Sequence, residues 1–139
     1  MDITIEQTHE RAPVTIMKLT GKLDASCYED VIAKAKELYQ TGTRNLLLDL
    51  SDLSFMSSAG IIALHRIALL MRGEQIPETQ EGWAAFHDVS HYVESGQGFE
   101  KHFKLLNPNP RVGHTLETAG FKNTFEIYTD SKAAIASFE

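Results

Sequence analysis

The apolar run NLLLDL, at residues 45–50, is the feature that most constrains how this 139-residue chain can fold. It is short, it is bounded by turn residues, and its leucines do not alternate regularly with polar residues. Such a run is typical of a strand that is buried on both faces of a sheet. We therefore expect an α/β protein with this strand near the middle of the sheet.

The residues around this run predict strands that are followed by helices. Residues 3–7 and 14–19 are rich in β-branched residues and predict an antiparallel hairpin. A capping-box pattern from Ser26 to Glu29 predicts the start of a first helix, which ends at Gly42. Further along the chain we expect a helix at 61–72, a strand at 103–106, a helix at 111–119, a strand at 125–128 and a helix at 131–138.

This order predicts a mixed β-sheet of about five strands, with four main helices packed largely on one face. Strands that are joined through helices lie parallel and are connected by right-handed crossovers. A chain of 139 residues is too short for two ordinary domains, so we expect residues 1–139 to form one domain. Between about 74 and 102 the regular pattern weakens, which indicates an inserted segment before the fourth strand. Its middle, residues 83–93, can form a short amphipathic helix.

Charge and hydropathy exclude several classes of function. The formal net charge is −6 and no basic cluster is present, so we expect no direct contact with nucleic acid. The N-terminus lacks the apolar core of a signal peptide, and the longest apolar stretch, 59–71, is interrupted by His65 and Arg66. We therefore expect a cytoplasmic protein without membrane insertion.

We expect neither a metal nor another cofactor. Cys27 is the only cysteine, which excludes an internal disulfide and a thiolate cluster. His87 and His91 are four residues apart, a spacing that can hold a metal ion on a helix, but no third ligand is evident. The sequence also lacks a glycine-rich phosphate loop and a nucleophile elbow, so we predict that the chain is not an enzyme.

Two adjacent serines, Ser57 and Ser58, stand where the buried strand gives way to the second predicted helix. The first amides of a helix lack partners within the helix, and together with the macrodipole they favour an oxyanion or a phosphate group. The simplest alternative is that a serine here only caps the helix, which contributes about 1 kcal/mol. The two roles are compatible, because one serine can cap the helix while the other is exposed.

Three stretches of the chain together resemble the STAS domain family. They are Gly21-x-Leu23-Asp24, LLLDLSDLSFMSSAGIIAL, and LLNPNPRVGHTLETAGFKNTFEIYTDSKAAIASF. The family's fold is shared by bacterial anti-sigma-factor antagonists and the cytoplasmic tails of sulfate transporters. The resemblance implies a regulatory protein-binding module that takes part in signal transduction and transcription regulation.

The resemblance also implies a phosphorylated serine. In the antagonists the pattern after the central strand is Asp-Ser-Ser-Gly, and its first serine is phosphorylated by a partner kinase that doubles as the anti-sigma factor. Ser58 matches this phosphoacceptor, and Ser57, which stands in place of the aspartate, is the second choice. Ala59 replaces the second serine and Gly60 matches the glycine.

The implied partner is a kinase-type anti-sigma factor or a related signalling protein, and a weak homodimer remains an open alternative. The predicted partner-binding residues are Asp24, Ser57, Ser58, Ala59, Gly60, Ile62, His65 and Arg66. For Asp24, a role as a turn residue before Ser26 is an equal alternative. Two other functions stay open. One is a non-phosphorylated STAS scaffold or subunit of a signalling or transport complex. The other is a small-ligand sensor whose insert covers a pocket bordered by Trp83, His87 or Tyr92.

Overall fold

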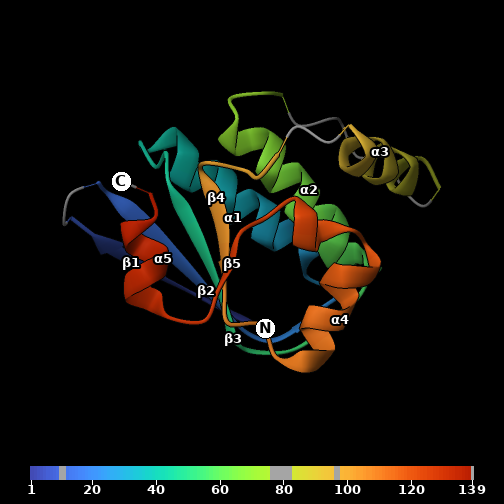
Figure 1. The fold of residues 1–139 in the computed structure, drawn as a ribbon, viewed down its shortest axis with the longest axis horizontal. Helices are drawn as coiled ribbons and strands as arrows, with labels where there is room; N and C mark the ends of the chain where they lie inside the picture. Colours follow the sequence, from blue (N-terminus) through green and yellow to red (C-terminus); the bar gives the residue numbers. More distant parts are fainter. Residues whose placement is uncertain (10–11, 76–82, 96–97, 139) are drawn as a thin grey trace.

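A five-stranded sheet forms the centre of the computed structural model, which describes residues 1–9, 12–75, 83–95 and 98–138 (Figure 1). The strand order is β1-β2-β3-β4-β5. The first pair is antiparallel and the other three pairs are parallel, which confirms the predicted mixed sheet. The strands are β1 (Asp2–Thr8), β2 (Val14–Leu23), β3 (Leu46–Met56), β4 (Phe103–Leu106) and β5 (Ile127–Tyr128).

Strand β3 is the central strand, as the apolar run predicts. Leu46, Leu47 and Leu48 are all fully buried, because helices cover both faces of the sheet at this point. The strand is longer than expected. Residues 51–56, which follow the predicted strand, continue the pairing with β2 as far as Leu23 opposite Met56. This extension brings the ends of β2 and β3 to the same edge of the sheet.

Three helices pack on one face of the sheet and a fourth packs on the other. The larger core cluster contains residues of α1 (Tyr28–Gln40), α2 (Ser58–Met71) and α4 (Pro110–Thr118). The smaller cluster, in which Leu47 and Leu106 meet Ala134, joins α5 (Ser131–Ala136) to the opposite face. Figure 1 shows α5 apart from α1, α2 and α4.

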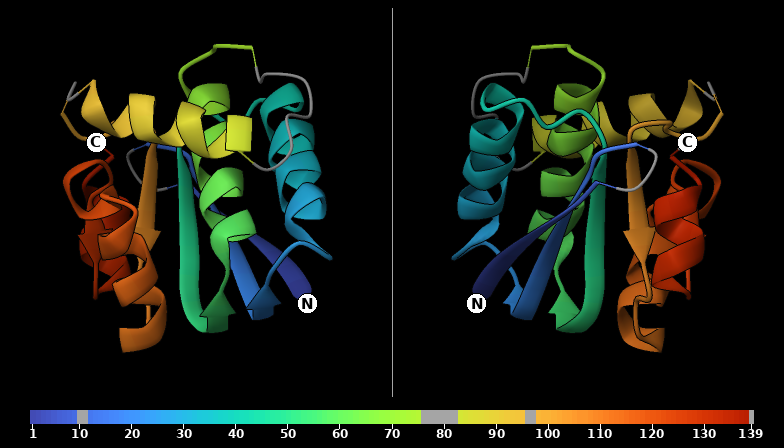
Figure 2. Two further views of the ribbon diagram at one scale, coloured as in Figure 1. Left: turned by 90° about the vertical axis from the view of Figure 1, so that its right-hand side faces the viewer. Right: turned by 90° about the vertical axis from the view of Figure 1, so that its left-hand side faces the viewer.

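The predicted insert contains a helix, α3 (Trp83–Glu94), close to the expected bounds. Figure 2 shows that α3 runs crosswise to α2, on the side of α2 that faces away from the sheet. Val89 and Tyr92 of α3 are buried and belong to the larger core cluster. The helix is therefore a third layer over α2, and it covers residues that would otherwise face solvent.

Two local predictions are wrong. The N-cap of α1 is Cys27, without a side-chain cap, because the Ser26 hydroxyl donates to Asp24 instead of capping the helix. The last strand spans only residues 127–128, because the 3-10 helix η1 (Phe121–Asn123) leads into a turn in which the amide of Phe125 donates to the carbonyl of Phe121. Among the described helices, none combines the length and the apolar character that crossing a bilayer requires.

Candidate functional site

The serine pair lies at the sheet edge where β2 and β3 end. The amide of Ser57 donates a hydrogen bond of 2.9 Å to the carbonyl of Leu23. Ser57 is the N-cap of α2, and its hydroxyl accepts a hydrogen bond of 3.2 Å from the amide of Ala59. Ser57 therefore fulfils the capping role that the sequence left open between the two serines.

Ser58 is the first residue of α2 and is exposed to solvent. Its hydroxyl group makes no hydrogen bond to any other residue in the described part of the chain. The first turn of α2 contains no acidic residue, so the positive end of its dipole is not neutralised locally. A hydroxyl in this position is accessible to a modifying enzyme, and a phosphate group attached to it would be stabilised by its own helix.

Asp24 follows the last residue of β2 and holds the turn into α1. Its carboxylate accepts hydrogen bonds from the amide and the hydroxyl of Ser26, at 2.9 and 2.5 Å. These two bonds lower the pKa of Asp24, so the side chain is a carboxylate at neutral pH. The turn role, one of the two alternatives, is thus observed. The Leu23–Ser57 hydrogen bond brings this turn to the same edge as the serine pair.

Gly60 allows α2 to start close to the sheet. It is buried, and a Cβ atom at this position would lie 2.4 Å from Cγ of Met56 and 3.1 Å from Cδ2 of Leu23. Any other residue would push the first turn of α2 away from the ends of β2 and β3. Gly60 therefore positions Ser57 and Ser58 and does not itself present a surface.

Three predicted partner-binding residues are not available at the surface. Ile62, His65 and Arg66 are only 8%, 5% and 6% exposed. Helix α3 accounts for part of this burial, since the ring of His65 lies 4.7 Å from that of Tyr92, centroid to centroid. Burial also lowers the pKa of His65 to about 4, so this side chain is neutral at physiological pH. Direct contact of these residues with a partner stays a prediction, and it requires that their side chains become exposed.

The sequence does contain a signal for this burial. Helix α2 is apolar nearly all round, in SAGIIALHRIALLM, and such helices are normally buried on every side. Because His65 and Arg66 are polar, we expected the face of the helix that carries them to be exposed. What covers α2 was not apparent, because α3 follows a stretch with little periodic pattern.

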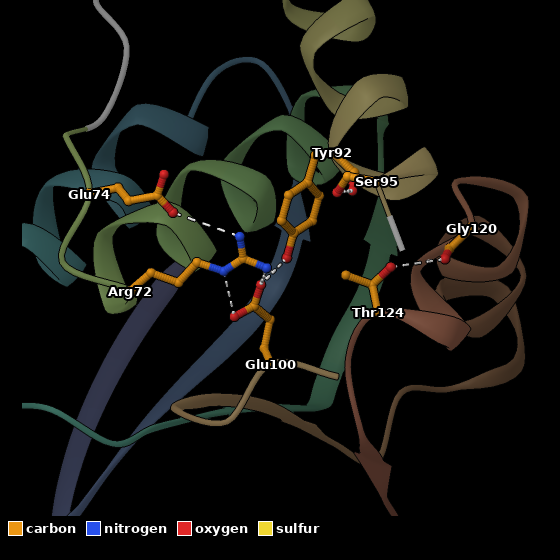
Figure 3. A network of polar contacts seen from close by, with 7 residues as sticks. All are labelled: Arg72, Glu74, Tyr92, Ser95, Glu100, Gly120 and Thr124. Carbon is orange, nitrogen blue, oxygen red and sulfur yellow. Dashed lines mark hydrogen bonds and ion pairs between the residues drawn. The ribbon is translucent and has the colours of Figure 1, made fainter. Parts of the chain in front are cut away.

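A cluster of three side chains fastens α3 to the end of α2 (Figure 3). We call Arg72, Tyr92 and Glu100 the insert clasp. Nε of Arg72 donates to Oε2 of Glu100 at 3.0 Å, and a second nitrogen of the guanidinium pairs with Oε1. The Tyr92 hydroxyl also donates to Oε1 of Glu100. Burial and this carboxylate both raise the pKa of Tyr92, which keeps the phenol protonated as a donor.

A groove of about 520 Å³ opens beside Ser58. Its described lining comes from three helices: Ser58 and Ile61 of α2, Val89 and Ser90 of α3, and His114, Thr115, Thr118 and Ala119 at α4. The sequence did not predict this groove, because its walls are distant in sequence and meet only after α3 folds over α2. The sequence predicted two of the helices that form its walls, at 83–93 and 111–119, but not that they meet beside Ser58.

The remaining residues singled out in the sequence are His87, His91, Trp83 and Tyr92. His87 and His91 are both exposed, and within the described residues no group of three or more His, Cys, Asp or Glu side chains is placed to hold a metal ion. The side chain of Trp83, which we expected at the border of a ligand pocket, lies outside what the structure describes. Tyr92 is engaged in the insert clasp.

Comparison with known proteins places this geometry in context. The model of the STAS domain matches residues 6–76, a segment that includes the serine pair. No curated protein sequence matches the chain.

Solved structures match nearly the whole chain. An anti-sigma factor antagonist from Mycobacterium paratuberculosis superposes with a TM-score of 0.65 at 15% identity, over 99% of this chain and 94% of that chain. The Bacillus cell fate determinant SpoIIAA in its phosphorylated form gives a TM-score of 0.62 at 17% identity, over 99% of this chain and 100% of that chain. At these identities the likeness shows that the fold is shared.

Proposed function

The chain belongs to the STAS domain family, and from this premise we propose that it is a regulatory module that binds a kinase-type anti-sigma factor and is released when Ser58 is phosphorylated. The single observation that supports this most strongly is that the two serines have different roles. Ser57 caps α2 with its hydroxyl, which leaves the Ser58 hydroxyl exposed at the start of the helix. A purely structural role would need only one of them.

The binding surface in this proposal is the sheet edge around the start of α2. Asp24, Ser57, Ser58 and Ala59 all lie there, and none of them is fully buried. The unphosphorylated chain presents a neutral hydroxyl at the same sheet edge as the Asp24 turn, and the anti-sigma factor binds this surface in place of its sigma factor. By this action the chain regulates transcription from the cytoplasm without catalysing a reaction.

Phosphorylation ends the contact through charge and size. The kinase transfers the γ-phosphoryl group of ATP to Oγ of Ser58. A P–O bond to the serine forms, ADP leaves, and the hydroxyl proton passes to a base of the kinase. The product carries about −1.5 to −2 charges at pH 7, which the start of α2 tolerates but a partner surface that fits a hydroxyl does not. The switch therefore needs no rearrangement of the core.

We also propose that residues 1–139 form a single STAS-like domain in which the segment at about 74–102 is an insert. The matches to solved structures over 97–99% of the chain support one domain. The position of α3 as a layer outside α2 supports its description as an addition to the α/β core.

Mass spectrometry after incubation with ATP and a purified kinase-type anti-sigma factor of the same organism tests the proposal. We expect one phosphate, on Ser58, in the wild-type chain. The Ser57→Ala variant should be modified at the same residue, and Ser58→Ala should stay unmodified. A phosphate on another residue, or none with any such kinase of that organism, would overturn the phosphorylation switch.

A further inference from the structure

The groove beside Ser58 has an apolar floor. Ile61 and Val89 line it although each is only 4–5% exposed, so both side chains are packed in the core with one surface towards the groove. On the α4 wall, the hydroxyl of Thr118 donates to the carbonyl of His114 at 2.9 Å, and that of Thr115 donates to the carbonyl of Arg111 at 3.3 Å. Because both protons are already used, this wall offers few donors to a ligand.

Among its described lining residues, the groove carries no fixed charge. None of its described lining residues is Asp, Glu, Lys or Arg, although the chain carries 19 acidic and 13 basic residues. His114 is the only ionisable side chain among them. An ionic group placed here would lose hydration without gaining a counter-ion, whereas an apolar side chain would gain from burial. The lining therefore selects an uncharged, apolar occupant.

One wall of the groove is supplied by the predicted insert. Val89 and Ser90 belong to α3, and α3 is fastened to α2 by the insert clasp of Arg72, Tyr92 and Glu100. The carboxylate of Glu100 is 6% exposed and is satisfied by both partners. A buried, fully paired cluster of this kind holds α3 in a fixed position, so the wall exists before any partner binds.

We propose that this groove receives an apolar side chain of the kinase-type anti-sigma factor, and that α3 thereby determines which anti-sigma factor is recognised. The inference rests on the proposed function, because the groove begins at Ser58 and is continuous with the surface described above. Phosphorylation then acts on the groove as well. A phosphate at its rim places charge where the bound apolar side chain must be desolvated, which weakens the contact.

Affinity measurements with three variants separate the two proposals. Ser90→Arg introduces a long, charged side chain into the α3 wall at an exposed position. Ser131→Arg makes the same chemical change on α5, on the opposite face of the sheet, and serves as the matched control. Ser58→Asp imitates the phosphorylated state. Each is titrated against the purified anti-sigma factor by isothermal titration calorimetry, after circular dichroism has confirmed that the variant is folded.

We expect Ser90→Arg to weaken binding at least tenfold and Ser131→Arg to change it less than twofold. If Ser58→Asp abolishes binding while Ser90→Arg binds as tightly as the wild type, the groove inference is overturned and the proposed function stands. If the wild-type chain binds no such anti-sigma factor, the proposed function falls, and the groove inference falls with it.

A measurement on the wild-type chain tests the inference even if a variant fails to fold. Amide chemical shifts of the wild type, recorded with and without the anti-sigma factor, should change at Ser90, Thr115 and Thr118. Shifts that change around Asp24 and Ser58 but not at these three residues would place the partner outside the groove. Changes that also arise from concentrating the chain alone would indicate a second copy as the occupant and would equally overturn the inference.

Discussion

The backbone amide of Ser57 donates a hydrogen bond of 2.9 Å to the carbonyl of Leu23, which joins the last residue of β2 to the N-cap of α2. Asp24 follows Leu23 and Ser58 follows Ser57, so this bond holds the acidic turn and the exposed hydroxyl at the same edge of the sheet. The site is therefore built by the pairing of two parallel strands and is independent of long flexible loops.

Replacing either serine by alanine should separate capping from signalling. Ser57→Ala removes the acceptor for the amide of Ala59 and should lower the free energy of unfolding by about 1 kcal/mol. Ser58→Ala removes an exposed hydroxyl without a described partner and should change it by less than about 0.5 kcal/mol. Urea denaturation measures both. Equal losses in the two variants would contradict the assignment of the cap to Ser57.

Two glycine substitutions in helices should have opposite effects. Gly60→Ala places a methyl group 2.4 Å from Cγ of Met56 and should destabilise the chain by about 1–3 kcal/mol. Gly113→Ala, in α4, meets no described atom within 4 Å and should stabilise it by roughly 0.5–1 kcal/mol. Thermal unfolding of the two variants makes the comparison. A neutral Gly60→Ala would show that the close approach of α2 to the sheet is not required.

The insert clasp should contribute to stability chiefly through Glu100. Arg72→Met leaves this buried carboxylate without its cation and should cost about 3 kcal/mol, while Tyr92→Phe removes one donor and should cost about 1–2 kcal/mol. The control is Glu74→Gln, because the exposed pair of Arg72 and Glu74, at 3.7 Å, should contribute less than about 0.5 kcal/mol.

Hydrogen exchange shows where the clasp acts. Amides of α3 should exchange faster in Tyr92→Phe and Arg72→Met, whereas those of β3 should change only as far as global stability does. Uniform acceleration across all elements, without a larger effect in α3, would mean that the clasp does not specifically hold the insert.

Protonation of His65 should weaken the fold at acidic pH. Burial lowers its pKa from the ordinary value of 6.5 to about 4 in the folded chain, so the unfolded state binds more protons between these two values. The free energy of unfolding therefore falls as the pH falls from 7 towards 4, by about 2 kcal/mol between pH 7 and pH 5.

The measurement for His65 is denaturation at both pH values. Four charged neighbours also act on the pKa of His65. Asp88 and Glu100 raise it, whereas Arg66 and Arg72 lower it. The His65→Phe variant keeps an aromatic ring against Tyr92 but cannot take up a proton, so its pH dependence should be smaller by that amount. An unchanged pH dependence would show that His65 is not the group responsible.

Local patterns in the sequence were sufficient for the central strand and for the serine pair. The run at 45–50 is apolar on both faces because both faces of β3 are covered, and Ser57 caps α2 because the helix starts directly after that strand. Both features leave a signal within a few residues of sequence, which is why they can be inferred from the chain alone.

Features that depend on distant contacts could not be inferred. His65 and Arg66 are buried in a helix over which α3 packs, and the groove beside Ser58 needs walls from three helices. Sequence periodicity does not report packing between remote segments.

Competition between neighbouring hydrogen-bond partners was a second obstacle. At the start of α1, the Ser26 hydroxyl can bond either to the helix or to Asp24, and it donates to the carboxylate of Asp24.

The most direct test of the Ser58 switch is the affinity of the purified kinase-type anti-sigma factor for two forms of the chain, measured by calorimetry under identical conditions. One form is unmodified and the other carries phosphoserine at position 58, installed during synthesis. We predict tight binding of the unmodified form and at least a hundredfold weaker binding of the phosphorylated form. Equal affinity of the two forms would contradict the switch.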